Sequence, residues 1–458
     1  MIRRLVVLGG LGDLTRRYLA PALVELREAG ELPDDFELVT GARADWSQEG
    51  FRTELAEALA QHASQRPEAT RHGLVQQSSY IRTDATEAED VRACLEPERG
   101  PALVYLALPP SVFVPAVRAL GQAGLPEGSR LVVEKPFGRD LPSARELNST
   151  IHDCLYEEAV FRIDHFLGMQ TVRNILGIRF ANRILEPVWG ADHVEAVEII
   201  WEETLTLEGR AFYDEVGAVR DMIQNHLLQL LSLVAMEPPD SLEGDPFRDR
   251  KAAVLQAIRC LEPEEVAART FRARYGAGRV EGHEVPAYAK EDGVDPERGT
   301  ETFAEVELTV DNDRWRHVPF RLRTGKALAR ERKEIVVRFH TPGRGPFVAS
   351  HPARNELRIG LADTETLDLG LNVTGAGERL VPEAVELGKE LGRDALSAYA
   401  RVLLGALAAD PTLSIRNDEV EASWAIVDPI LEAWAQGQPP LHEYPAGGRP
   451  NAEGKPES

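Results

Sequence analysis

The sequence lacks several features that mark particular classes of protein. Its 458 residues contain no run approaching the ~20 consecutive apolar residues that a membrane helix requires. The three cysteines, Cys94, Cys154 and Cys260, are scattered and odd in number, so we expect neither a disulfide framework nor a metal site. The chain begins with a strand-like run and no charged leader, so we expect no signal peptide and a cytoplasmic location.

Positive charge is also scarce. The chain has 52 Lys and Arg against 75 Asp and Glu, which gives a formal net charge of -23. Nucleic acids require a basic face, so the composition argues against such a partner. Any site for an anionic small molecule must therefore be local, built from a few cations and helix N-termini.

The first third of the chain alternates strand and helix patterns. Short apolar runs that end at glycine or proline predict strands at Arg3–Leu8, Phe36–Thr40, Leu103–Leu108 and Leu131–Glu134. Residues Leu14–Leu26 have helical apolar spacing. This alternation predicts an α/β domain over 1–165 with a Rossmann-type doubly wound parallel sheet, which binds nucleotides at the carboxyl ends of its strands.

The pattern changes near residue 170. Helical spacing is expected at Val172–Ile184 and Val219–Met236, and extended runs at Thr302–Val310, Trp315–Arg323 and Glu334–His340. We therefore expect a larger α+β domain over 166–445 with a mainly antiparallel sheet. Residues 446–458 follow a segment rich in Pro, Gly and Glu and are expected to form a disordered tail.

A glycine-rich turn, Gly9-Gly10-Leu11-Gly12-Asp13-Leu14, lies between the first expected strand and helix. Glycines let the backbone approach a pyrophosphate, and a helix N-terminus offers free N–H groups to it. The pattern departs from G-x-G-x-x-G, so an ordinary turn is the alternative, but its position favours a nucleotide. We expect Gly9, Gly12, Asp13 and Leu14 to contact the cofactor.

Two further strand ends belong to the expected cofactor site. Arg43 follows the second strand, where an arginine suits the extra phosphate of NADP; Asp45 is close by, and a solvated loop arginine is the alternative. Pro109 ends the third strand. We expect NADP, with NAD possible.

Six longer stretches, taken together and in order, resemble the glucose-6-phosphate dehydrogenase family from residue 1 to about residue 448. They are Gly9–Leu23 (GGLGDLTRRYLAPAL), Glu134–Asn148 (EKPFGRDLPSARELN), Arg162–Asn182 (RIDHFLGMQTVRNILGIRFAN), Arg220–Gln229 (RDMIQNHLLQ), Arg323–Leu328 (RTGKAL) and Trp424–Leu431 (WAIVDPIL). The resemblance implies a Rossmann domain followed by a larger β+α domain. It also implies a homodimer or homotetramer, usually dimerised through the sheet, and oxidation of an aldopyranose to its lactone.

The resemblance assigns the chemistry to particular residues. His226 is the base for the anomeric hydroxyl and Asp164 is its carboxylate partner, since a neutral imidazole titrates near working pH and a carboxylate stabilises the cation that forms. Without the resemblance, a structural role would be the simpler reading of both. The resemblance also implies that Lys135 contacts both the cofactor and the sugar, and that Glu203 and Asp221 bind sugar hydroxyls. Asp221 lies five residues before His226, which on a helix is a neighbouring quadrant.

The sequence departs from the family in the phosphate pocket, which normally reads His-Tyr-Leu-Gly-Lys. Here it reads His165-Phe166-Leu167-Gly168-Met169, so a hydroxyl donor and a cation are missing and His165 remains. Charged hydrogen bonds contribute roughly 1.5–3 kcal/mol each, so phosphate binding could be much weaker. Arg173, one helical turn after Met169, could compensate, or be merely solvated.

Other features leave further alternatives open. Lys326, with Arg330 or Arg332, could close the phosphate pocket, and Tyr18 stands where the family prefers Lys. The altered pocket motivates a second hypothesis, the same chemistry on unphosphorylated glucose or another aldose. A non-catalytic regulatory homologue, and another Rossmann oxidoreductase family marked by Glu-Lys-Pro, are weaker hypotheses, because the candidate catalytic residues are present.

Overall fold

The computed structural model describes residues 2–207, 209, 212–362, 366–375, 380–392 and 395–450. The chain falls into two compact units. The first unit contains 1–170, 239–249 and 394–421, and the second contains 171–238, 250–393 and 422–458. The first unit thus takes in two segments from the range that the sequence analysis assigned to the second domain.

The first unit is built on a seven-stranded sheet in the order β17-β6-β5-β4-β1-β2-β3. Six strands are parallel, and β17 is antiparallel to β6 at one edge. The strands are β1 (Arg4–Leu8), β2 (Glu37–Ala42), β3 (Ser78–Arg82), β4 (Leu103–Leu106), β5 (Arg130–Glu134), β6 (Val160–Ile163) and β17 (Ser414–Ile415). The expected doubly wound sheet is confirmed.

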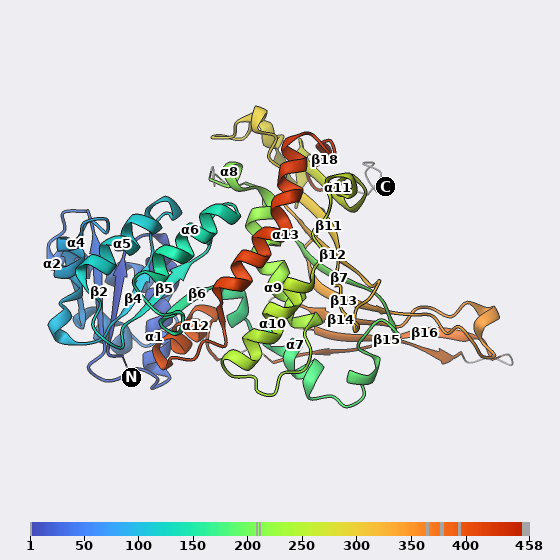
Figure 1. Cartoon of the computed structure of the whole chain (residues 1–458), viewed down its shortest axis with the longest axis horizontal. Coiled ribbons are helices and arrows are strands. Elements are labelled where there is room, and N and C mark those ends of the chain that lie inside the picture. Colours follow the sequence, from blue (N-terminus) through green and yellow to red (C-terminus); the bar gives the residue numbers. More distant parts are fainter. Residues whose placement is uncertain are drawn as a thin grey trace. The chain divides into compact units, whose positions relative to one another are not determined.

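Helices pack on this sheet, as Figure 1 shows for the helices drawn around β2, β4 and β5. They are α1 (Ala20–Glu28), α2 (Gln48–His62), α3 (Glu68–Gln76), α4 (Ala88–Leu95), α5 (Phe113–Ala123), α6 (Leu141–His152) and α12 (Ala398–Ala408). Strands β1 and β4 are buried along their whole length, as expected for central parallel strands covered on both faces. Leu403 and Leu407 of α12 share a core with Leu23 of α1.

The second unit is built on a nine-stranded sheet in the order β16-β15-β14-β13-β7-β12-β11-β8-β18. Only the pairs β7–β12 and β8–β18 are parallel among the described strands of this sheet. Its strands are β7 (Val194–Glu202), β8 (Thr270–Gly276), β11 (Phe303–Thr309), β12 (Pro319–Gly325), β13 (Arg332–Phe339), β14 (Glu356–Gly360), β15 (Thr366–Thr374), β16 (Pro382–Glu390) and β18 (His442–Pro445). A small hairpin joins β9 (Gly278–Val280) to β10 (His283–Val285). The mainly antiparallel sheet is confirmed.

The helices of the second unit include the one that carries His226. They are α7 (Gln170–Phe180), α8 (Tyr213–Ala218), the π-helical segment Val219–Leu227, α9 (Leu228–Ala235) and α11 (Pro263–Arg269). Two further helices, α10 (Asp245–Ala257) and α13 (Asn417–Ala435), contain residues of both units. The strand expected from Trp315 begins only at Pro319, because Trp315 is buried in a turn and donates its indole N–H to the Ala235 carbonyl at 2.8 Å.

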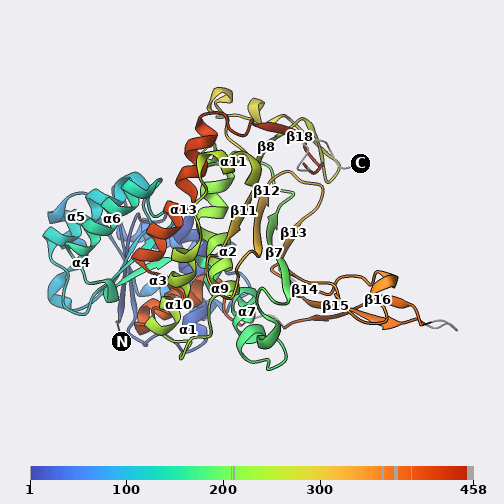
Figure 2. The same cartoon turned by 45° about the vertical axis from the view of Figure 1, so that its right-hand side comes forward.

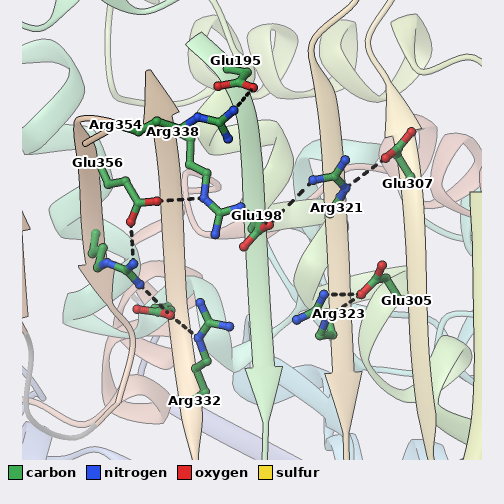
Figure 3. Close-up of polar contacts among 12 residues, drawn as sticks. Glu195, Glu198, Glu305, Glu307, Arg321, Arg323, Arg332, Arg338, Arg354 and Glu356 are labelled. Atoms are coloured by element: carbon green, nitrogen blue, oxygen red, sulfur yellow. Dashed lines mark hydrogen bonds and ion pairs between the residues drawn. The ribbon is translucent and has the colours of Figure 1, made fainter. Parts of the chain in front are cut away.

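Side chains alternate sharply across the central strands of this sheet. One face carries apolar residues such as Phe320 and Leu322 of β12, which are fully buried. The other face carries arginines and glutamates that pair between strands, as Figure 3 shows. For example, Arg338 of β13 donates to Glu198 of β7 at 2.7 Å and to Glu356 of β14 at 2.9 Å.

Strands β15 and β16 continue beyond the rest of the sheet as a two-stranded ribbon (Figure 2).

Part of the expected tail is ordered. Gly447 donates its N–H to the Ala327 carbonyl at 2.8 Å, and Arg449 donates to Glu202 at 3.2 Å. Residues 451–458 lie outside the described residues. Where the chain is described, every helix is too short or too polar to cross a membrane.

Candidate cofactor and substrate sites

The expected cofactor residues of the first unit follow four parallel strands. Gly9 comes directly after β1, Arg43 after β2, Pro109 shortly after β4 and Lys135 directly after β5. Carboxyl ends of parallel strands meet at one edge of a sheet, which is where doubly wound folds bind their ligands. The structure therefore brings these residues to one edge.

The first two glycines of the turn, Gly9 and Gly10, have no room for a side chain. Gly9 and Gly10 have φ angles of 125° and 60°, which side chains rarely adopt. A Cβ atom on Gly9 would lie 2.0 Å from the Ala107 carbonyl oxygen, and one on Gly10 would lie 2.6 Å from Cβ of Ala42. The turn is thus a bare backbone cradle that a phosphate group can approach closely.

The helical segment after the glycine turn starts within the turn itself. The Arg16 N–H bonds the Gly12 carbonyl at 3.0 Å, so the first turn begins at Gly12, and Thr15–Leu19 is π-helical. The Asp13 side chain is 87% exposed and lies 3.6 Å from Arg17, which offsets its negative charge beside an anion site. Leu14 is half-buried. The cradle and the N–H groups of this helix start fit the pyrophosphate of a dinucleotide.

Arg43 lies exposed just beyond β2. Hydrogen bonds from Thr86 are the main reason that the pKa of Asp84 is lowered, and the nearby guanidinium of Arg43 lowers it further. An exposed guanidinium next to the second strand fits the extra phosphate of NADP. Asp45 is exposed as well.

A buried carboxyl group lies beside Lys135. Burial raises the pKa of Glu134 to about 7, and the neighbouring Asp164 raises it too, whereas the Tyr105 hydroxyl and Lys135 lower it. The Tyr105 hydroxyl donates a hydrogen bond to Glu134. Lys135 was predicted from the sequence, but Glu134 was not, because its burial among titratable groups depends on the fold. Such perturbed groups gather at functional sites.

Asp164 directly follows β6 and is fully buried. Its carboxylate accepts the Phe166 N–H at 3.0 Å at the start of the 3-10 turn His165–Gly168. The His165 ring is half-buried and stacks on Tyr399 of α12, with ring centroids 5.3 Å apart and planes 9° from parallel. Tyr399 in turn stacks on Tyr18 at 5.0 Å.

Tyr399 was not expected from the sequence, because its contact with His165 depends on how α12 packs. Burial is the main cause that raises the pKa of Tyr399, with Glu134 and a hydrogen bond to Glu134 adding to it. Gly168 fits tightly here, since a Cβ atom on it would lie 2.5 Å from the Ala398 carbonyl oxygen. The aromatic column of Tyr18, Tyr399 and His165 therefore includes the expected phosphate donor, His165, and adjoins Glu134.

The two residues that depart from the family differ in exposure. Phe166 is 7% exposed, whereas Met169 is partly exposed in an extended conformation with ψ of 139°. Met169 directly precedes α7, which begins at Gln170, and the expected one-turn relation to Arg173 stays a prediction. Arg173 lies exposed on α7.

In the second unit, His226 is 1% exposed and Asp221 is half-buried. Both lie on the π-helical segment Val219–Leu227, where the sequence analysis expected an α-helix. π-helical turns are rare and occur frequently at functional sites.

Glu203 and Lys326 lie together in the second unit. They follow the parallel neighbours β7 and β12 and form an ion pair, with Lys326 Nζ 2.9 Å from Glu203 Oε2. Two neighbours were missed by the sequence analysis: Lys333 lies 3.9 Å from Glu203, and the Trp201 indole N–H donates to Glu203 at 3.3 Å. Strand pairing brings Lys333 close to Glu203, because Lys333 of β13 is the register partner of Trp201, two residues before Glu203.

The two arginines expected beside Lys326 have different surroundings. Arg330 is exposed, and Arg332 donates a hydrogen bond to Glu334. Both line a cavity of about 510 Å³ together with Lys333 and Arg358. The second unit therefore holds a group of cations near Glu203, together with the carboxylates of Glu331 and Glu334.

A doubly wound sheet with a glycine cradle at its carboxyl edge, joined in one chain to an antiparallel-sheet unit with a buried histidine, defines a nicotinamide-dinucleotide-dependent oxidoreductase. Comparison with protein families specifies it further. Residues 6–174 match the family model "Glucose-6-phosphate dehydrogenase, NAD binding domain" and residues 176–455 match "Glucose-6-phosphate dehydrogenase, C-terminal domain". The chain belongs to the glucose-6-phosphate dehydrogenase family.

Individual relatives agree. The glucose-6-phosphate 1-dehydrogenase of Treponema pallidum is 39% identical over 467 residues, covering 97% of this chain and 91% of the relative. That of Gluconobacter oxydans is 38% identical, covering 96% and 93%. A solved glucose-6-phosphate dehydrogenase in complex with its substrate glucose-6-phosphate has a TM-score of 0.89 at 30% identity, covering 98% of this chain and 96% of that one.

Proposed function

We propose that this chain oxidises the anomeric hydroxyl of glucose 6-phosphate to the lactone, with NADP as the electron acceptor. The observation that carries the proposal is that both family domain models match a chain that keeps His226, Asp164 and Lys135. The nicotinamide ring, when bound, accepts the hydride. The glycine cradle and Arg43 support NADP, and NAD is the second acceptor to test.

In this proposal His226 takes the proton of the anomeric hydroxyl as a neutral imidazole. Asp164 orients that imidazole and stabilises the imidazolium, as the carboxylate of a catalytic triad does. Lys135, directly after β5, binds oxygen atoms of the sugar next to the cofactor. Burial of His226 and Asp164 supports both roles, because charge–charge interactions strengthen away from water.

Binding of the sugar and its phosphate is divided among other residues. We propose that Asp221 and Glu203 accept hydrogen bonds from sugar hydroxyls, and that His165, Arg173 and Lys326 bind the phosphate. The Lys326–Glu203 ion pair supports a single polar site in the second unit.

A comparison of substrates tests the proposal against the same chemistry on an unphosphorylated sugar. We expect kcat/KM for glucose 6-phosphate to exceed that for glucose by several orders of magnitude with NADP. The names of the relatives favour this outcome, whereas Phe166 and Met169 motivate the alternative. Equal kcat/KM values for the two sugars would contradict the proposed substrate.

His226→Asn tests the assignment of the base. We expect turnover to fall by about 100-fold or more, in the range of general base catalysis, while sugar binding followed by tryptophan fluorescence is kept. His72→Asn, at an exposed position on α3, is the matched control and should leave turnover unchanged. Unchanged turnover in His226→Asn would refute the assignment.

We also propose that the protein is a cytoplasmic homodimer or homotetramer without nucleic-acid or membrane partners. The net charge of -23 supports the absence of a nucleic-acid partner.

The ribbon of β15 and β16 supports self-association, because it exposes apolar side chains: Leu387 is 59% exposed and Val373 is 46% exposed. Exposed apolar patches mark interfaces. Light scattering of the wild type and of Leu387→Glu tests this: we expect an oligomer that the substitution weakens, and a wild-type monomer would contradict it.

A further inference from the structure

The π-helical segment Val219–Leu227 changes the relation between Asp221 and His226. At its end the Leu228 N–H donates to two carbonyls, that of Asn225 and that of Ile223, which lies five residues earlier. On an α-helix, five residues would separate the two side chains by about 140° around the axis. In a π-helix the same step closes one hydrogen-bonded turn, so Asp221 and His226 occupy one face. The catalytic arrangement that we propose therefore depends on this segment staying π-helical.

A single buried carboxyl group holds the start of this segment. Glu301, which lies just before β11, is 7% exposed, and its Oε1 accepts the Val219 N–H at 3.0 Å. Its main-chain carbonyl accepts the Ala218 N–H at 3.3 Å and is 3.5 Å from the Tyr213 hydroxyl, which donates to it. The first N–H groups of a helix have no partner within the helix, so Glu301 satisfies them from a distant part of the chain.

Gly217 shows how closely Glu301 fits. Gly217 breaks the preceding helix with φ of 72° and ψ of 173°. A Cβ atom there would lie 2.6 and 2.8 Å from the two carboxylate oxygens of Glu301. Any side chain at 217 would therefore displace Glu301 from the helix start.

The surroundings of Glu301 raise its pKa, and burial is the largest cause. Burial raises its pKa, while the Val219 N–H and the more distant charges of Arg220 and Arg272 lower it. An ionised carboxylate at a helix N-terminus also interacts favourably with the helix dipole. When it is ionised, Glu301 therefore binds the helix start more strongly than a neutral acceptor would.

We propose that Glu301 is a positioning residue for the reaction. By binding the Val219 amide it fixes where the π-helical segment starts, and thereby holds His226 on the same face as Asp221. It does so without touching the substrate or the cofactor. The proposal rests on the proposed role of His226 as the base.

The test combines Glu301→Gln with His226→Asn. Gln keeps an oxygen acceptor but loses the charge, so we expect a folded protein whose KM for glucose 6-phosphate stays near the wild-type value. We expect kcat to fall about tenfold or more, since a misplacement of about 1 Å can cost about 100-fold. Glu301→Ala should lower kcat further. Glu198→Gln, a buried glutamate on the charged face of the sheet, is the matched control and should keep kcat.

The double variant separates positioning from a purely structural role. If Glu301 acts through His226, Glu301→Gln should not further reduce the residual turnover of His226→Asn, measured at high enzyme concentration. An equal loss in both backgrounds would overturn the proposal, and so would wild-type kcat in folded Glu301→Ala. Failure of the proposed base would be seen separately, as full activity of His226→Asn alone.

Discussion

Glu134 should make the stability of this protein depend on pH in an unusual direction. Its pKa is raised from 4.5 to about 7, chiefly by burial. A raised carboxyl pKa means that folding favours the protonated form, so its stabilising contribution is complete below pH 4.5 and is lost as the pH rises through 7. At about 1.4 kcal/mol per pH unit, the loss amounts to about 3 kcal/mol.

Glu134→Gln isolates this effect, because Gln has a similar shape and does not titrate. The melting temperature of the variant minus that of the wild type should rise between pH 4.5 and 8. For a unit of 150–250 residues, about 2–4 °C per kcal/mol gives a change of about 6–12 °C. Differential scanning fluorimetry across this range measures it. Effects of other carboxylates are largely common to both proteins and cancel in the difference.

Two further variants sharpen the experiment. Glu146→Gln, whose side chain is 59% exposed on α6, should show a difference that does not change with pH. Tyr105→Phe removes a hydrogen bond that lowers the pKa of Glu134, so its stability loss should extend to higher pH than in the wild type. A pH-independent difference between Glu134→Gln and the wild type would refute the reasoning, since Glu134 would then ionise at its ordinary pKa.

Three other predictions concern binding. Gly9→Ala should abolish NADP binding and lower the melting temperature, because its Cβ would lie 2.0 Å from the Ala107 oxygen. Gly100→Ala is the control: its Cβ would have nothing within 4 Å, so this variant should lose only the smaller amount of stability that comes from an alanine at a φ of 89°. Arg43→Ala should reduce kcat/KM with NADP by about 10–100-fold, as loss of a charged hydrogen bond implies, and leave the value with NAD nearly unchanged. Met169→Lys should lower KM for glucose 6-phosphate by about tenfold and leave KM for glucose unchanged. Steady-state kinetics measures both KM values, and an equal change in the two would contradict the prediction.

Local pattern was enough to predict the central strands and the glycine turn. Strands β1 and β5 are apolar runs, and each is followed at once by a residue of the expected cofactor site, Gly9 or Lys135. In a parallel sheet this order in the chain also determines the position in space, since all such residues lie at one edge. The position of these residues at one edge of the sheet could therefore be predicted from the sequence, and their contact with the cofactor stays a prediction.

The contacts that were missed depend on long-range packing. Helix α12 joins the core of the first unit from residue 398 onwards, and nothing in its own apolar spacing indicates which sheet it covers. Its Tyr399 consequently could not be linked to His165. The π-helical segment was missed for a related reason, because its partner Glu301 lies 82 residues from Val219 in the sequence.

The cations near Glu203 suggest how so acidic a chain can attract an anionic sugar. Lys326 lies 2.9 Å from the Glu203 carboxylate, and the two charges cancel. The neighbouring cavity is lined by four cations, Arg330, Arg332, Lys333 and Arg358, and by two carboxylates, Glu331 and Glu334, so its lining carries two net positive charges. Lys326 is only 9% exposed as a side chain, and its charge is therefore screened less by salt than that of a surface lysine. The Trp201 indole beside Glu203 and the Tyr213 ring beneath Lys326 hold the pair between aromatic surfaces. A local surplus of positive charge can bind an anionic group even though the whole chain carries a net charge of -23.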